Sequence, residues 1–120
     1  MAELESYLQR KCQKLLKEEG NAFVFKTHGD IYGRVGIPDL VACIPVTKEV
    51  VQNLLDEGYF DTGKIGIFTG LEIKRKDLLR KVSEAQKIVG REIRDAGGLW
   101  YSIDDTETLL ALLMKLKGVI

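Results

Sequence analysis

The sequence predicts an α/β domain in which a central mixed β-sheet is flanked by helices. Segments rich in β-formers alternate with segments whose apolar residues recur every three or four positions, in the order αββ, an inserted helix, then βαβα. The 120 residues are 45% apolar and 30% charged, which is typical of one globular domain with a single core. We therefore expect one domain over residues 1–120.

Five elements are predicted in the first half of the chain. In order, they are a helix over 3–19, a strand over 22–27, a Gly-rich loop over 28–38, a buried strand over 39–44 and a short helix over 47–57. Gly20 ends the first helix, since glycine commonly follows the last helical turn. Thr47 is a suitable N-cap for the second helix, and Gly58 ends it.

The second half of the chain is predicted to form a βαβ unit followed by a helix. Its elements are a strand over 65–74, a helix from Ser83 to Ala96, a strand over 99–103 and a final helix from Asp104 or Asp105 to Leu116. A strand–helix–strand crossover of this kind is expected to be parallel and right-handed. The core order is thus αβββαβ, with one inserted helix and one C-terminal helix.

Two charged residues end the strand over 65–74. Ile65, Ile67, Thr69, Leu71 and Ile73 alternate on one side, which we expect to face the core. Glu72 and Lys74 share the opposite side. This pair is either a surface ion pair of little energetic value or part of a built site, since a buried carboxylate needs partners.

A second carboxylate, that of Asp39, stands at the mouth of the apolar strand 39–44, directly after Pro38. If the strands over 39–44 and 65–74 are antiparallel neighbours, Asp39 faces Glu72. Two carboxylates at such a distance repel unless a cation lies between them, and oxygen ligands suit Mg²⁺ or Mn²⁺. Asp39 could instead be a simple turn residue.

Cysteine and histidine are too few for a zinc site. The chain has two cysteines, Cys12 and Cys43, and one histidine, whereas structural zinc usually takes four such ligands. We expect both cysteines to be buried, reduced thiols.

Several motifs arrive in the order of a known nuclease family. They are Glu5 in an N-terminal helix, Gly36-Ile-Pro38-Asp39-Leu40, Glu72-Ile-Lys74-Arg75, Ser83-Glu-Ala-Gln86, and Gly97-Gly-Leu-Trp-Tyr101. In this order the chain resembles the VRR-NUC branch of the PD-(D/E)XK nuclease superfamily, and the likeness covers nearly all of it. The 32-residue spacer between Asp39 and Glu72 is longer than in compact members, because residues 46–64 insert a helix.

The resemblance implies a restriction-endonuclease-like core and a metal-dependent endonuclease. It implies that Asp39, Glu72 and the backbone carbonyl of Ile73 hold Mg²⁺ or Mn²⁺, with Glu5 as an outer carboxylate. Lys74 would orient or help deprotonate the attacking water and stabilise charge on the phosphate, which agrees with the physics of such sites. Gln86 would assist the site.

Some assignments stay open. Glu3 is an alternative to Glu5, although Glu5 shares a helix face with the apolar residues and Glu3 does not. Gln86 has a competing explanation as the fourth residue of a capping box with Ser83. His28 lies on the Gly-rich loop and stays outside the catalytic set.

The charge distribution favours one basic face on a neutral protein. The 18 basic and 18 acidic residues balance, but residues 74–94 carry eight basic and three acidic side chains, a surplus of five. The expected phosphate contacts are Arg75, Lys76, Arg80, Lys81, Arg34 and Lys26. A basic face that is merely solvated is the alternative.

Partners and location follow from the resemblance and the composition. Stand-alone relatives of this size are similar to phage-encoded proteins, so branched DNA such as a four-way (Holliday) junction, met in phage replication, recombination or repair, is the expected substrate. Paired cuts in a symmetrical junction favour a homodimer, with the helix over 47–57 as a candidate surface.

No apolar run reaches the roughly 18 residues of a membrane span, and the N-terminus lacks a signal-peptide pattern. A cytoplasmic protein is expected, in the host cell if phage-encoded. Two alternatives to this endonuclease stay open. One is a nucleic-acid-binding module without catalytic activity, and the other is a nuclease that acts on RNA or on a specific DNA sequence.

Overall fold

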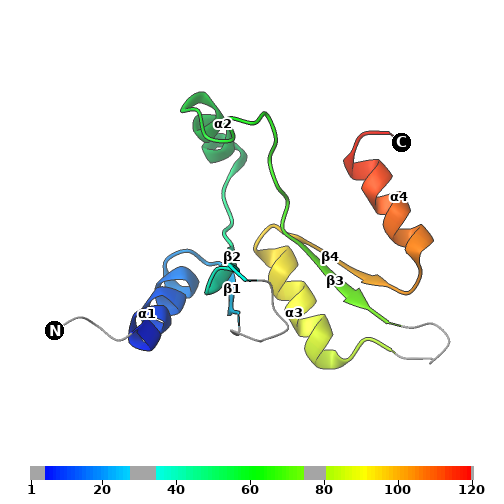
Figure 1. The fold of residues 1–120 in the computed structure, drawn as a ribbon, viewed down its shortest axis with the longest axis horizontal. Coiled ribbons are helices and arrows are strands. Elements are labelled where there is room, and N and C mark those ends of the chain that lie inside the picture. The colour runs from blue at the N-terminus through cyan, green and yellow to red at the C-terminus, as the bar shows by residue number, and fades with distance from the viewer. Residues whose placement is uncertain (1–4, 28–34, 75–80, 120) are drawn as a thin grey trace. The chain divides into compact units, whose positions relative to one another are not determined.

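A computed structural model describes residues 5–27, 35–74 and 81–119 of the chain. Two compact units, Met1–Ile67 and Phe68–Ile120, each hold two helices and one two-stranded sheet within these residues (Figure 1). The predicted mixed α/β class is confirmed. A single central sheet is not among the strand pairings of the described residues, and the single-domain organisation stays a prediction.

The first unit begins with the helix α1, Glu5–Glu18, which packs against the strands β1, Phe23–Lys26, and β2, Leu40–Cys43. The half-buried residues of α1 recur at helical spacing and so form the face toward the sheet; they are Gln9, Cys12, Gln13 and Leu16. Leu8 and Leu15, two of the apolar residues that recur at helical spacing in this segment, are exposed. The inward side of α1 is therefore more polar than the sequence pattern predicts.

The turn after α1 reverses the chain into the sheet. Asn21 adopts φ 50°, and the Ala22 N–H donates to the Leu16 carbonyl at 3.1 Å. Asparagine tolerates this left-handed conformation better than most residues. The predicted end of the helix at Gly20 is confirmed, since α1 stops two residues before it.

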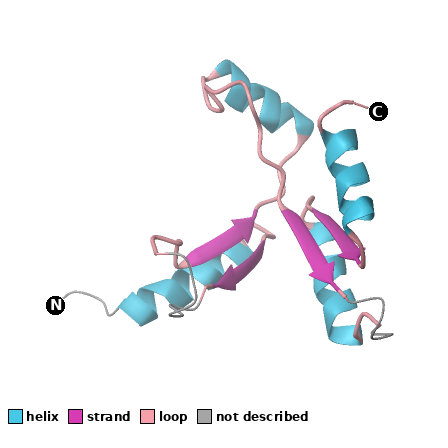
Figure 2. Ribbon diagram, turned by 45° about the vertical axis from the view of Figure 1, so that its right-hand side comes forward, coloured by secondary structure: helices cyan, strands magenta, loops and turns pink. Residues whose placement is uncertain are grey.

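The strands β1 and β2 form an antiparallel pair (Figure 2). Phe23 lies opposite Cys43 and Lys26 opposite Leu40, and the Thr27 N–H extends the ladder to the Asp39 carbonyl at 3.0 Å. Asp39 therefore immediately precedes β2 instead of beginning it.

The helix α2, Lys48–Asp56, follows β2 and agrees with the sequence prediction. Thr47 is its N-cap and accepts a hydrogen bond from the Val50 N–H at 3.2 Å, while Gly58 takes φ 89° after its last turn. No residue of α2 is buried, and Val50 and Leu55 are exposed.

The second unit is the predicted βαβ unit with a C-terminal helix, although its first strand begins at Thr69 and not at the predicted residue Ile65. The strands β3, Thr69–Ile73, and β4, Leu99–Ile103, pair in parallel, and the helix α3, Glu84–Asp95, connects them (Figure 2). The helix α4, Thr106–Leu116, follows β4 and is capped by Asp105, which accepts from the Thr108 N–H at 2.7 Å.

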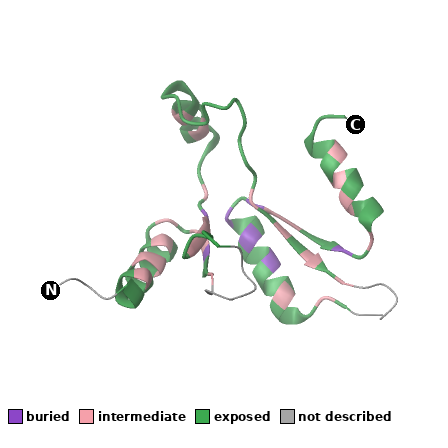
Figure 3. Cartoon of the chain, viewed as in Figure 1, coloured by how far each residue is buried: buried purple, intermediate pink, exposed green. Residues whose placement is uncertain are grey.

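The helix α3 lies close to the sheet because a glycine faces the only tryptophan of the chain. Gly90 and Ile93 are the buried residues of α3, visible in purple in Figure 3. A Cβ atom at Gly90 would come within 2.6 Å of the Trp100 ring. Arg94, one helical turn after Gly90, also contacts Trp100, with its guanidinium 5.4 Å from the Trp100 ring centre and Nη2 donating to the Trp100 carbonyl at 2.9 Å.

Gly90→Ala is expected to destabilise the second unit, although alanine is the better helix former by about 1 kcal/mol. The added methyl would overlap the Trp100 ring, and overpacking of this kind costs roughly 1–3 kcal/mol. Urea unfolding followed by Trp100 fluorescence measures the change. Ala85→Gly, at an exposed position of the same helix, is the control for propensity alone. Equal or higher stability of Gly90→Ala would contradict the close packing.

The face of β3 that is covered differs from the prediction. Leu71 is 39% and Ile73 63% exposed, whereas Gly70 and Glu72 are half-buried. A Cβ atom at Gly70 would lie 3.0 Å from Ile93 of α3. The helix therefore packs on the side of Gly70 and Glu72, because glycine leaves room for it, and the expected core face of Leu71 and Ile73 is wrong within this unit.

The two cysteines are free thiols, with Cys43 buried and Cys12 half-buried. Burial raises the pKa of the Cys43 thiol above its ordinary value. The neutral thiol therefore favours the folded state at pH values below the ordinary thiol pKa of about 8.5, and this contribution is lost as the pH rises through the raised folded value.

In a Cys12→Ser protein, Cys43 is expected to react with iodoacetamide more slowly in the folded state than in urea, because the thiolate is the reactive form. Mass spectrometry over a time course at pH 8 measures the two rates. Equal rates would show that Cys43 is not buried.

Candidate active site

The candidate site lies where β3 ends beside the first turn of α3. Glu72 points to the side of β3 that α3 covers, as Gly70 does two residues earlier. Lys74 continues the ladder after the strand, since its N–H donates to the Ile103 carbonyl at 3.0 Å. The parallel pairing with β4 thus holds the backbone on which Glu72 and Lys74 stand.

Glu72 and Lys74 form a half-buried ion pair. Lys74 Nζ lies 3.7 Å from Glu72 Oε1, and the side chains are 18% and 28% exposed for Lys74 and Glu72 respectively. The side chains of this pair are therefore more buried than those of an ordinary surface ion pair, which was one of the two interpretations that the sequence allowed. For comparison, Lys87 and Glu84 of α3 pair at 3.4 Å with 49% and 82% of their side chains exposed.

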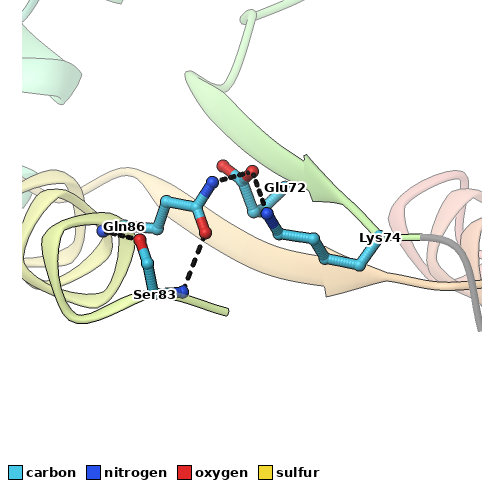
Figure 4. Close-up of polar contacts among 4 residues, drawn as sticks. All are labelled: Glu72, Lys74, Ser83 and Gln86. Carbon is cyan, nitrogen blue, oxygen red and sulfur yellow. Dashed lines mark hydrogen bonds and ion pairs between the residues drawn. The ribbon is translucent and has the colours of Figure 1, made fainter. Parts of the chain in front are cut away.

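Gln86 belongs to the capping box of α3 and also contacts Glu72 (Figure 4). The Ser83 N–H donates to Gln86 Oε1 at 2.9 Å, and the Gln86 N–H donates to Ser83 Oγ at 3.2 Å. At the other end of the same amide, Gln86 Nε2 donates to Glu72 Oε1 at 2.6 Å. Gln86 can therefore serve both as the capping-box residue of α3 and as a partner of Glu72, the two interpretations that the sequence left open.

We call Glu72, Lys74, Ser83 and Gln86 the Glu72 cluster. Both described contacts of the carboxylate fall on one oxygen, Oε1. Among the described residues, none donates to Oε2. Carboxylate oxygens are the ligand type that Mg²⁺ and Mn²⁺ prefer, and Glu72 is the one carboxylate of this cluster.

The backbone of Ile73 also fits its predicted role. Phe68 and Lys74 bond to β4, through the Phe68 carbonyl with the Leu99 N–H at 2.9 Å and through the Lys74 N–H. Because amide groups alternate in direction along a strand, the carbonyl of Ile73 faces the edge opposite β4. No described strand pairs with that edge.

Asp39 and Glu5, the other predicted carboxylates, lie in the first unit. Asp39 is exposed just before β2, and Thr27 fixes its backbone by donating from N and from Oγ1, the latter at 3.2 Å, to the Asp39 carbonyl. Glu5 is exposed in the first turn of α1. In Figure 2, α1 begins on the side of the first sheet where β2 also begins.

Gln9, one helical turn after Glu5, lies outside the motifs that predicted the site. Its Oε1 atom is buried and has no hydrogen-bond partner among the residues that the structure describes, an uncommon state for a buried amide oxygen. The signal was the spacing of Glu5, Gln9 and Gln13, which lie four residues apart on one face.

The approach of Asp39 to Glu72 stays a prediction. It depends on pairing of β2 with β3, and the described pairings are β1 with β2 and β3 with β4. Among residues 5–27, 35–74 and 81–119, no three His, Cys, Asp or Glu side chains form a group that could hold a metal ion.

Most of the predicted phosphate contacts lie outside the described residues. These are Arg34, Arg75, Lys76 and Arg80. His28 and Glu3, whose roles the sequence left open, also lie outside the described residues. Lys26, at the end of β1, and Lys81, just before α3, are described and exposed. Lys81 stands two residues before Ser83 and thus next to the Glu72 cluster in sequence.

Comparisons of the chain with protein-family models, curated proteins and solved structures return no match. None of the helices in the described part of the chain is long and apolar enough to cross a membrane.

Proposed function

We propose that the chain is a Mg²⁺- or Mn²⁺-dependent endonuclease with a restriction-endonuclease-like core of the VRR-NUC type. The observation that supports this most is the Glu72 cluster. Glu72 and Lys74 of the E-x-K motif meet Gln86 of the S-x-x-Q motif in three dimensions, 14 residues apart in sequence. An isolated surface ion pair would need no such third partner.

The proposed metal site joins residues of both units. Asp39, Glu72 and the Ile73 carbonyl would hold the ion, with Glu5 in an outer position, and this requires β2 to lie beside β3 in one central mixed sheet. A bound Mg²⁺ or Mn²⁺ supplies Lewis-acid chemistry, since it polarises a phosphoryl oxygen and lowers the pKa of water.

The chain's own side chains have distinct tasks in this proposal. Lys74 carries three N–H donors, so its ammonium can stay near Glu72 Oε1 and still donate to a phosphate oxygen as negative charge develops there. Gln86 holds Glu72 by its hydrogen bond to Oε1, which restricts rotation of the carboxylate.

The proposed substrate is structured DNA, with a four-way junction as the first choice and phage replication, recombination or repair as the setting. Lys26, Lys81, Arg34, Arg75, Lys76 and Arg80 would contact phosphates and set the register without reading sequence. We propose a homodimer as the active unit. The exposed apolar side of α2, with Val50 and Leu55, is the candidate surface.

A substrate panel tests the proposal. Four-way junction, flap and linear DNA, together with an RNA of the same sequence, are incubated with the protein in Mn²⁺, in Mg²⁺ and in EDTA. We expect metal-dependent cleavage of the junction above all. Cleavage of RNA or of one linear sequence would move the proposal to the alternative nucleases. Binding of DNA without cleavage in either metal would support the catalytically silent module instead.

A further inference from the structure

The amide of Gln86 is engaged at both of its ends (Figure 4). Its oxygen accepts from the Ser83 N–H at 2.9 Å, and its nitrogen donates to Glu72 Oε1 at 2.6 Å. A flipped amide would place the NH₂ group against the Ser83 N–H and the oxygen against the Glu72 carboxylate. Both contacts would then be repulsive, so the backbone of Ser83 selects one of two orientations.

We propose that Ser83 is a positioning residue whose main-chain N–H orients the Gln86 amide so that Glu72 always meets an NH₂ group. Ser83 acts through Gln86 and touches neither substrate nor metal. The orientation follows from the contacts of the second unit alone; its consequence for metal binding rests on the proposed function.

The same contacts couple the start of α3 to the carboxylate. The capping box joins Ser83 to Gln86 by two hydrogen bonds, and Gln86 joins the helix to Glu72. An N-cap that serves only its helix would satisfy the first-turn N–H groups and stop there. Here the cap also reaches Glu72, because the Gln86 amide that accepts from Ser83 donates to Glu72 Oε1. Because coupling is reciprocal, a cation bound by Glu72 would in turn stabilise the first turn of α3.

Two substitutions at Ser83 separate its side chain from its N–H. Ser83→Ala removes Oγ and keeps the N–H that orients Gln86. Ser83→Pro removes both, and the native φ of −72° is one that proline adopts. Thr47→Pro is the matched control, because Thr47 is also an N-cap, with φ −78° and ψ 162° against ψ 163° at Ser83. Its partner Val50 has no side-chain amide to orient.

The first readout is the side-chain NH₂ resonances of Gln86 in the ¹H–¹⁵N spectrum of the full chain without metal. We expect distinct, slowly exchanging signals in the wild type, Ser83→Ala and Thr47→Pro. In Ser83→Pro we expect them to move to the position of a solvated glutamine. Unchanged signals in Ser83→Pro, or equal loss in Ser83→Ala, would overturn the proposal.

A measurement on the unaltered protein keeps the proposal testable if Ser83→Pro fails to fold. A scalar coupling across the hydrogen bond, between the Ser83 amide ¹⁵N and the Gln86 side-chain carbonyl ¹³C, reports the contact directly. We expect it with a size like the couplings within α3. Its absence, where the α3 couplings are seen, would overturn the proposal.

The second readout is Mn²⁺ affinity by isothermal titration calorimetry. Loss of a group that directly holds a metal ligand, as Gln86 holds Glu72, typically weakens metal binding by about 10–100-fold. We expect a loss of up to this size for Ser83→Pro, which frees Gln86, and none for Thr47→Pro. If the wild type binds no Mn²⁺ while the NMR results hold, the proposed function fails and the positioning role stands. If Ser83→Pro binds Mn²⁺ as the wild type does, the coupling of the cap to the metal is wrong.

Discussion

Lys74→Ala is expected to slow DNA cleavage by about 10²–10³-fold, the usual loss when one group that stabilises developing charge is removed. The Lys74 side chain is 18% exposed and its Nζ lies 3.7 Å from Glu72 Oε1. The ammonium group is therefore held at the end of β3 and is only partly hydrated. Single-turnover cleavage of the four-way junction, with protein in excess, measures the effect separately from DNA affinity.

Lys87→Ala is the control for this loss. Lys87 also pairs with a glutamate, Glu84, but on the exposed surface of α3, where such pairs are worth little. We expect Lys87→Ala to cleave at the wild-type rate. Trp100 fluorescence checks that both variants keep the second unit folded. A Lys74→Ala protein that is no slower than Lys87→Ala would refute the role of Lys74.

Glu72→Gln is expected to abolish detectable metal-dependent cleavage while preserving side-chain volume. The substitution removes the charge that we propose to bind a divalent cation. It also places a neutral amide against Gln86 and Lys74, which in the wild type both contact Oε1. Loss of a direct ligand should cost more than the roughly 10–100-fold in metal affinity that loss of an outer partner costs.

The comparison variant is Glu84→Gln, which makes the same chemical change on the exposed pair with Lys87. It should retain cleavage. Raising Mn²⁺ in steps shows whether the defect of Glu72→Gln lies in metal affinity, because an affinity defect is partly recovered at high metal. Wild-type cleavage by Glu72→Gln at low Mn²⁺ would exclude Glu72 as a ligand.

Local signals predicted the elements of this chain well. Ser83 and Thr47 cap the helices that the sequence assigned to them, and β4 has the predicted bounds, Leu99–Ile103. The parallel pairing of β3 with β4 is also as predicted. These features depend on residues a few positions apart, or on the general geometry of a βαβ crossover, which sequence patterns carry directly.

The side of β3 that is covered could not be predicted from alternation, which divides a strand into two faces without saying which face a helix takes. The apolar residues Leu71 and Ile73 suggested one side, yet Gly70 and Gly90 allow α3 to approach on the other. Small residues that permit close packing were the overlooked signal.

Sequence patterns likewise predicted the local part of the candidate site, but not the part that depends on long-range pairing. Glu72, Lys74 and Gln86 were proposed from short motifs, and the structure brings them together. Their catalytic roles stay predictions. The predicted approach of Asp39 to Glu72 depends on pairing between β2 and β3. These strands are separated by a helix and a long connection, and no local pattern specifies such a pairing.

In the proposed nuclease, Asp39 and Glu72 hold one divalent ion, and Mn²⁺ binding to four proteins is the decisive test. Calorimetry on the wild type, Asp39→Asn, Glu72→Gln and the double variant gives a double-mutant cycle. We predict that each single substitution weakens Mn²⁺ binding strongly and that the double variant is no weaker than either one. Wild-type affinity in Asp39→Asn, or in Glu72→Gln, would show that the two carboxylates do not share an ion.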